Sequence, residues 1–291
     1  MEYRLENEKY VVRVAAKGAE LLGLYSKETE HEYMWQAAPE AWNAHSLLLF
    51  PCCGRIDRSR ILARGKEYPL PMHGFAKDME FEVLFASSVK VSMMLTYNKD
   101  TLRVFPYKFG LRVEFELTDA GIEERFTVYN YGKDEMPFSL GGHPAFFCPV
   151  DLDSEASDCV LEFDREQHIR EYALDPTRLI RTDDTTPFLD GTTVRLSDDF
   201  FNNGPKVLGG VSASSVTLKS EKTGHFMRMG LEGFPFMTLW GVGTRMTIIA
   251  IEPWCGTSDV SGTDHVWEKK YGNEHLSPGK TFERKFVFNL G

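Results

Sequence analysis

The 291-residue chain lacks every cysteine pattern that would indicate a metal site or a disulfide framework. Its five cysteines are an odd number without regular spacing, namely Cys52, Cys53, Cys148, Cys159 and Cys255. No C-x-x-C pair occurs, and cysteine and histidine never fall at zinc-finger spacing. We therefore expect no metal, and an unpatterned set of thiols favours a reducing compartment.

Positive charge and long hydrophobic runs are also scarce. The net charge is −10 and the isoelectric point is about 5.4, so the surface repels phosphate backbones and we expect no nucleic acid partner. No apolar run is long enough to cross a bilayer. The first ten residues, MEYRLENEKY, lack the basic and apolar regions of a signal peptide. We expect a cytoplasmic protein with no membrane partner.

Helical periodicity is rare, and linkers, repeats and low-complexity tracts are missing. A single short helix is expected over 39–48. Apolar and polar residues alternate with a period of two elsewhere, as in KVSMMLTY (90–97) and LRVEFEL (111–117), which is typical of strands. The turn signal at 118–121 predicts a hairpin between two long antiparallel strands. Together these features predict an all-β fold, a large antiparallel sandwich forming one domain over residues 1–291.

Two segments place basic side chains among glycines and prolines. In LLLFPCCGRID (47–57), Gly54 frees the backbone just before Arg55, whose planar guanidinium suits sugar hydroxyls or an acidic group. A surface pair of Arg55 with Asp57 is the simpler interpretation. In YPLPMHGFAKD (68–78), His73 precedes a glycine and Lys77 precedes an acidic residue. There a structural histidine and a lysine paired with its neighbour are equally ordinary.

Two further segments carry an acid and a base. FSLGGHPAFFCPV (138–150) presents His143 after two glycines, with Phe146 as a wall that excludes water. MTIIAIEPWCG (246–256) places Glu252 at the end of an apolar strand. A buried imidazole and carboxyl facing each other across a sugar ring would suit general acid–base chemistry. Trp240 and Trp254 could stack on the ring. No phosphate-cradling glycine loop is present, so a carbohydrate site fits better than a nucleotide site.

These motifs, in this order, resemble the aldose 1-epimerase (galactose mutarotase-like) family, particularly its LacX-type branch. HGFA, GGHPAF and IEPW together are a specific signature. The resemblance implies a galactose mutarotase-like β-supersandwich that interconverts the α and β anomers of a free sugar without a cofactor or metal. It makes Glu252 the general base, His143 the general acid, and His73 and Arg55 substrate-binding residues. We add Lys77, Phe146, Trp240 and Trp254 as substrate-binding candidates.

The chain departs from the family pattern at three places. Met72 and Lys77 replace the usual Gln and Arg around the HGFA motif, and two cysteines occupy the strand before Arg55. The family's substrate-binding aspartate has no secure match, although Asp198 and Asp199 lie near its expected position. These departures bear on substrate preference more than on the reaction.

Three other functions stay open at this point. A hexose-6-phosphate 1-epimerase would use a basic rim, for which the sequence offers Arg55, Arg58, Arg60, Arg64 and Lys77. A non-catalytic carbohydrate-binding protein would need the aromatic residues and arginine but no acid and base. A glycosidase would need two carboxylates flanking the bond, and only one is well placed. The expected partner is a small-molecule sugar, and the expected assembly is a monomer or homodimer.

Overall fold

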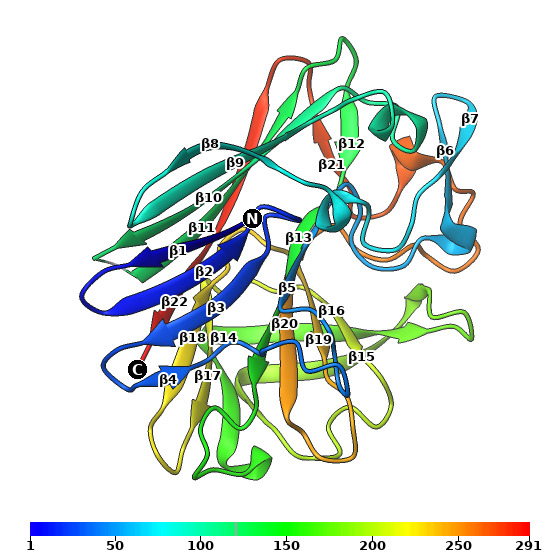
Figure 1. Cartoon of the computed structure of the whole chain (residues 1–291). Coiled ribbons are helices and arrows are strands. Elements are labelled where there is room, and N and C mark those ends of the chain that lie inside the picture. Colours follow the sequence, from blue (N-terminus) through cyan, green and yellow to red (C-terminus); the bar gives the residue numbers. More distant parts are fainter. Residues whose placement is uncertain (120) are drawn as a thin grey trace.

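The computed structural model describes residues 1–119 and 121–291, and these residues form an all-β protein as predicted. Most strands belong to one fourteen-stranded, largely antiparallel sheet that curls round on itself (Figure 1). Its order begins with β5 (Ser46–Leu49), β13 (Leu140–Phe147), β20 (Ile248–Cys255), β19 (Phe236–Trp240), β16 (Lys206–Gly209) and β14 (Cys159–Leu174). It continues with β17 (Ser215–Ser220), β18 (Phe226–Gly230), β22 (Thr281–Leu290), β11 (Gly121–Asn130), β10 (Phe109–Thr118), β9 (Lys90–Thr96) and β8 (Glu82–Ala86), while β15 (Ile180–Arg195) pairs with β14.

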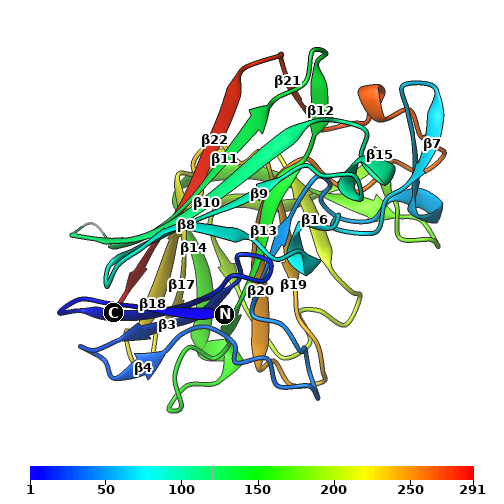
Figure 2. The ribbon, with the colours of Figure 1, turned by 45° about the horizontal axis from the view of Figure 1, so that its top comes forward.

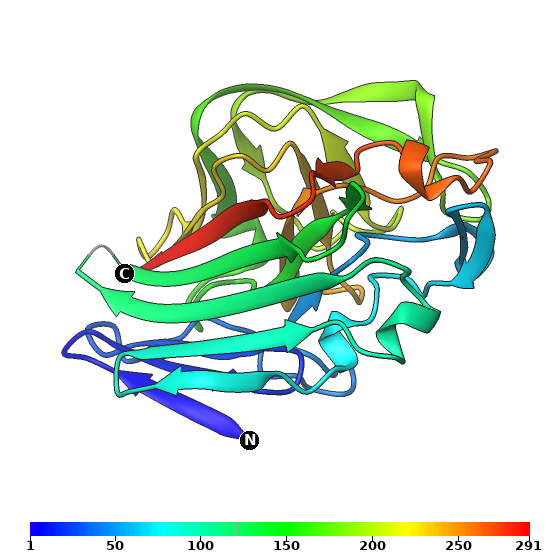
Figure 3. The ribbon, with the colours of Figure 1, turned by 90° about the horizontal axis from the view of Figure 1, so that it is seen from above.

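Three smaller sheets complete the fold. The N-terminal sheet contains β1 (Glu2–Glu6), β2 (Tyr10–Ala15), β3 (Leu21–Ser26) and β4 (His31–Glu32). It lies on the β8–β10 side of the molecule, where the Glu6 N–H donates to the Ser88 carbonyl (Figure 3). The other two sheets pair β6 (Arg60–Ala63) with β7 (Lys66–Pro69) and β12 (Met136–Phe138) with β21 (Glu274–Leu276). Figure 2 shows the β6–β7 and β14–β15 hairpins reaching toward the same side of the molecule.

The helical elements of the described residues are short 3₁₀ turns, namely η1 (Asp57–Ser59), η2 (Ala76–Asp78), η3 (Thr101–Arg103), η4 (Ala156–Asp158) and η5 (Trp267–Lys269). The helix predicted over 39–48 is wrong. The last residues of this segment belong to β5, which pairs with β13 in the main sheet. Just before and at the start of β5, the Glu20 carboxylate accepts the N–H groups of His45 and Ser46. Strand pairing therefore overrides the local helical pattern. No helix in the described part of the chain is long and apolar enough to span a membrane.

The predicted hairpin is confirmed by β10 and β11, which pair from Phe109 opposite Asn130 to Thr118 opposite Gly121. Ala120, in the turn that was predicted to join them, lies outside the described residues. Alternate residues of β10 are buried, as the period of two requires.

Phenylalanine fills the space enclosed by the curled sheet. In the part of the chain that the structure describes, ten of the twelve largest fully buried side chains are Phe. Contacts such as that between Phe146 on β13 and Phe288 on β22, with ring centroids 6.3 Å apart, join distant parts of the sheet. Burying each such ring contributes roughly 1.5–3 kcal/mol, so this core holds β13 and β20 rigidly in place.

Candidate active site

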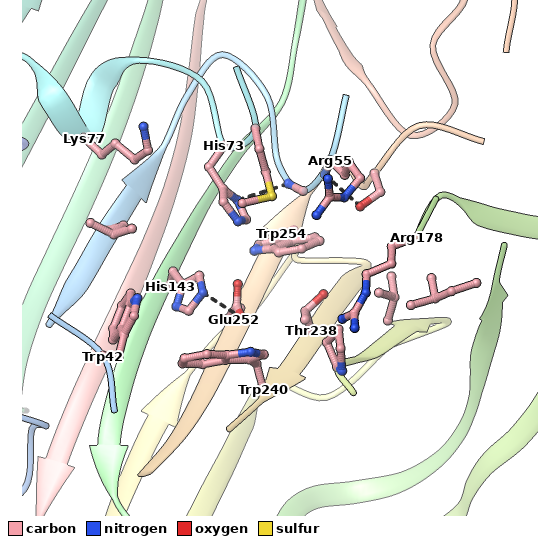
Figure 4. Close-up of a pocket in the computed structure, with 17 residues that line it drawn as sticks. Trp42, Arg55, His73, Lys77, His143, Arg178, Thr238, Trp240, Glu252 and Trp254 are labelled. Carbon is pink, nitrogen blue, oxygen red and sulfur yellow. Dashed lines mark hydrogen bonds and ion pairs between the residues drawn. The ribbon is translucent and has the colours of Figure 1, made fainter. Parts of the chain in front are cut away.

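A cavity of about 330 Å³ opens beside β13, β20 and β19, and its volume is in the range of small-molecule sites (Figure 4). Loops before and after β5, the β14–β15 turn and the segments flanking β16 and β20 close its sides. Its lining residues are Trp42, Leu47, Gly54, Arg55, Met72, His73, Lys77, His143, Leu174, Arg178, Pro205, Val207, Thr238, Trp240, Glu252, Trp254 and Ser258. The cavity therefore contains most of the side chains that the sequence motifs indicated.

Strand alternation explains why Glu252 faces this cavity. Glu252 and Trp254 occupy alternate positions of β20 and point to the cavity, whereas Ile251 before them and Cys255 after them join the core. Thr238 lies directly opposite Glu252 in the pairing of β19 with β20 and shares its face. The sequence suggested that Glu252 ends its strand, but β20 continues through Cys255.

The Gly-Gly-His-Pro segment is an interior part of β13. Its glycines make room for aromatic rings on both faces of the strand. A Cβ atom at Gly141 would lie 2.5 Å from the Trp254 ring, and one at Gly142 would lie 2.6 Å from the Phe286 ring. The close packing on these two glycines places His143 against the neighbouring β20.

His143 and Glu252 are in direct contact, with Nε2 of the imidazole 3.2 Å from Oε1 of the carboxyl group. Both side chains are buried, and Figure 4 shows them side by side at the floor of the cavity. The sequence predicted a separation of one sugar ring, so the two groups lie closer than expected. Loss of water contact lowers the pKa of His143 and raises the pKa of Glu252 well above its ordinary value.

Aromatic rings surround the His143 imidazole on several sides. Trp42 stacks on it with centroids 4.6 Å apart and an interplanar angle of 24°. Trp240 meets it edge to face at 5.7 Å, and His73 does so at 5.6 Å. Sequence reasoning missed Trp42 because it placed this residue in a helix; a tryptophan in a polar connecting segment was the available signal.

His73 is fixed in one tautomer by the backbone. Its Nδ1 accepts the Gly54 N–H at 3.2 Å, so in the neutral ring Nε2 carries the proton and can donate it to a ligand. The pKa of His73 lies well below its ordinary value. The main cause is loss of water contact, and the nearby His143 is the second cause. The turn that presents it needs Gly74, where a Cβ atom would lie 2.1 Å from the Phe50 carbonyl oxygen.

Arg55 lines the cavity, and the backbone around it is held from the β20 side. Its N–H donates to the Ser258 hydroxyl at 3.0 Å, and its carbonyl accepts the Asp259 N–H at 2.8 Å. Among the described residues, no ion pair or hydrogen bond involves its guanidinium, so the alternative pair with Asp57 is not formed. Lys77 also lines the cavity, but its Nζ is bonded to Asp78 at 2.5 Å and to the Gly74 carbonyl at 3.1 Å.

Three candidates from the sequence do not reach the cavity. Phe146 is three positions after His143 on the same strand, so it points to the opposite face and is fully buried in the core. The prediction that it walls the site is therefore wrong. Asp198 accepts the Met246 N–H and Asp199 accepts the Ser197 hydroxyl, and neither lines the cavity.

The cavity also contains features that sequence reasoning missed. Arg178 reaches it from the β14–β15 turn, and Thr238 reaches it from β19. The Thr238 hydroxyl, the Trp254 indole N–H and the second oxygen of Glu252 are buried without a hydrogen-bond partner in the described part of the chain. Buried polar groups normally have partners, so these three atoms are positioned to bind a polar ligand. No cluster of three or more metal-ligating side chains occurs among the described residues.

Comparison with known proteins gives a consistent result. The sequence profile of the family "Aldose 1-epimerase" matches residues 1–254. The chain is 31% identical to the plasmid-encoded protein LacX of Lactococcus lactis over 100% of its own length and 99% of that protein. A galactose mutarotase related enzyme from Lactobacillus acidophilus superposes with a TM-score of 0.94 at 31% identity, covering 100% of this chain and 97% of the other. A galactose mutarotase-like protein from Lactobacillus casei gives 0.93 at 30% identity, with 100% of both chains covered. The chain therefore belongs to the aldose 1-epimerase family, and its fold is galactose mutarotase-like.

Proposed function

We propose that the protein is an aldose 1-epimerase that interconverts the α and β anomers of a hexose. Ring opening requires a proton to leave the hydroxyl on C1 and a proton to reach the ring oxygen. In the proposed reaction the Glu252 carboxylate accepts the first proton and the His143 imidazolium donates the second. The open aldehyde rotates about the C1–C2 bond, and reclosure from the other face reverses both transfers.

The observation that supports this proposal is the contact between His143 and Glu252 inside a cavity with unsatisfied polar atoms. The two oxygens that exchange protons are both bonded to C1, so the acid and base must lie close together and not at opposite ends of the ring. A carboxyl and an imidazole 3.2 Å apart satisfy this requirement.

The proton balance of the pair also suits a reversible reaction. Before ring opening one proton resides on His143, and after it one proton resides on Glu252, so the total does not change. Burial favours the neutral arrangement of the two groups, whereas their close contact favours the charged arrangement. These opposing effects keep both proton positions accessible, as catalysis in both directions needs.

The surrounding side chains supply substrate binding in this proposal. Trp240 and Trp254 offer apolar faces to the ring, and the unpartnered Thr238 hydroxyl and Trp254 N–H face sugar hydroxyls. The proton on Nε2 of His73 and the guanidinium of Arg55 are further donors. Neither a metal nor a cofactor is required.

A glycosidase is not favoured, because Glu252 is the only carboxyl group among the described residues that lines the cavity and glycosidases ordinarily use two. A non-catalytic sugar-binding protein would have no use for an acid in contact with a base. The five cysteines are all free and buried, which supports our expectation of a reducing, cytoplasmic location.

The test is to follow anomer exchange in a panel of hexoses by polarimetry and by saturation-transfer NMR. We expect the exchange rate of at least one sugar to rise in proportion to protein concentration above the spontaneous rate. A panel in which no sugar shows acceleration, while the protein still binds sugar, would favour the binding protein instead.

A further inference from the structure

The charge of the cavity is opposite to that of the protein. The whole chain carries a net charge of −10, yet the side chains lining the cavity include three basic groups and one carboxyl. That carboxyl is Glu252, whose pKa is raised by burial. A positive cavity in an acidic protein is an electrostatic feature of the site itself, and it attracts anions.

Two of the basic groups, Arg55 and Arg178, are exposed and have no carboxylate partner. Among the described residues, no ion pair or side-chain hydrogen bond involves either guanidinium. Nearby arginines differ in this respect: Arg58, Arg60 and Arg64 pair with Asp57, Glu67 and Asp134, respectively. These three arginines do not line the cavity. Of the five basic residues that the sequence offered as a rim, only Arg55 and Lys77 line it.

Lys77 is not equivalent to these two arginines, because its ammonium group is already paired with Asp78. Figure 4 shows Lys77 apart from Arg55 and Arg178, which occupy the same side of the cavity with their guanidinium groups turned toward it. Two unpaired cations on one wall repel each other, and an anion between them would remove that repulsion.

The backbone presents both arginines in fixed positions. Arg178 has a φ of 64° in the β14–β15 turn. This left-handed backbone conformation costs energy for any residue other than glycine. The Asp175 carboxylate holds this turn by accepting the N–H groups of Thr177 and Leu179. Arg55 is held through Asp259, whose carboxylate is 3.6 Å from the Lys270 ammonium group in a buried pair.

The arginines lie away from the acid and base. In Figure 4, His143 and Trp42 occupy one side of the cavity, Arg55 and Arg178 the other, and Glu252, Thr238 and Trp254 lie between them. A sugar whose C1 contacts His143 and Glu252 would extend its far end toward the two guanidinium groups.

We propose that the substrate is an aldose with an anionic group, a phosphate monoester or a carboxylate, on a carbon remote from C1, and that Arg55 and Arg178 bind this group. This proposal rests on the proposed epimerase function. Guanidinium groups match both anions with paired, charge-assisted hydrogen bonds. The cavity thus combines an apolar and polar surface for the ring with a separate cationic wall for the charge.

The experiment compares three forms of one hexose: the neutral sugar, its 6-phosphate and its 6-carboxylate. Anomer exchange is measured by NMR to give kcat/KM for each. We expect one charged form to exceed the neutral form by about tenfold or more, since a charge-assisted hydrogen bond contributes about that factor. The phosphate and carboxylate arms show which anion the site prefers.

The Arg178→Ala variant then tests whether this arginine binds the anionic group of the substrate. We expect the ratio of kcat/KM for the charged and neutral forms to fall about tenfold or more, with partial recovery in Arg178→Lys. Arg58→Ala is the matched control, because this exposed arginine pairs with Asp57 outside the cavity, and its ratio should equal that of the wild type. A neutral sugar that matches or exceeds both charged forms would overturn the proposal, as would an unchanged ratio in Arg178→Ala.

Failure of the epimerase function gives a different result. If no sugar shows accelerated exchange, the catalytic proposal fails, and calorimetric titration with the same three compounds tests the anion site alone. Tighter binding of a charged form, lost in Arg178→Ala, supports the cationic wall, and equal binding of all three forms contradicts it.

Discussion

The imidazole of His143 and the carboxyl group of Glu252 touch across the boundary between two paired strands, with 3.2 Å between Nε2 and Oε1. Alternation along β20 turns Ile251 into the core and Glu252 toward the cavity, and the pairing of β13 with β20 brings His143 beside it. The pairing of two strands is therefore enough to bring the imidazole and the carboxyl group into contact. Further residues of β16, β19 and β20, together with the connecting loops, complete the cavity lining.

His143 should be needed for the rate of anomer exchange. We expect His143→Ala to lower kcat by about two to four orders of magnitude, the usual contribution of a general acid or base. Polarimetry with saturating sugar measures the effect. His168→Ala is the control, since this histidine is exposed and does not line the cavity. A His143→Ala variant with the wild-type rate would remove His143 from the reaction.

The pH–rate profile should be bell-shaped and broad. In the proposed reaction His143 and Glu252 together carry one proton, so activity falls when a second proton binds and when the last one leaves. Burial lowers the pKa of His143 and raises the pKa of Glu252, which moves the acid limb to lower pH and the alkaline limb to higher pH. Rates measured from about pH 3 to pH 10 check this expectation; a profile without either limb would contradict it.

Trp42 should act through His143. Its ring stacks on the imidazole and shields it from water, so Trp42→Ala should reduce kcat and raise the pKa of His143 toward its ordinary value. The acid limb of the pH–rate profile should then move to higher pH, an effect that loss of packing elsewhere would not produce. Trp42→Phe should restore most of the wild-type profile. An acid limb that stays in place in Trp42→Ala would show that the stacking has no electrostatic role.

Glu124 should make stability depend on pH. This buried residue on β11 has an oxygen without a hydrogen-bond partner, and burial raises its pKa to about 8. The unfolded chain releases the proton near pH 4.5 whereas the folded protein keeps it, so stability is lost as pH rises between these values. The loss at pH 7 is about 3 kcal/mol.

Glu124→Gln should remove this slope. Urea unfolding at about pH 5 and pH 8 measures it, and we expect the variant to gain stability relative to the wild type as pH rises. Glu8→Gln, at an exposed surface position, controls for loss of a negative charge. An equal effect of the two substitutions at both pH values would contradict the assignment.

The sequence predicted the strands and two of the cavity residues, His143 and Glu252, because both predictions depend on local patterns. A period of two and the GGHPAF and IEPW motifs are visible without any tertiary contact. Phe146 was misplaced because a residue near His143 along the same strand can still face the opposite side. The same motifs did not show the direct contact of His143 with Glu252, which depends on strand pairing.

Trp42 and Arg178 could not be found in the same way. Both lie in connections between strands, where no periodicity fixes the direction of a side chain, and both reach the cavity only through the tertiary fold. The helix expected over 39–48 failed for a related reason, because pairing of β5 with β13 decides the conformation of that segment.

The most direct test of acid–base catalysis is Glu252→Gln, measured for both exchange and binding. Gln keeps the shape of the side chain but cannot accept the C1 hydroxyl proton, and Glu232→Gln at an exposed position is the control. We expect the exchange rate to fall by at least about two orders of magnitude while calorimetry shows sugar binding retained. Exchange at the wild-type rate in Glu252→Gln would contradict catalysis by this pair.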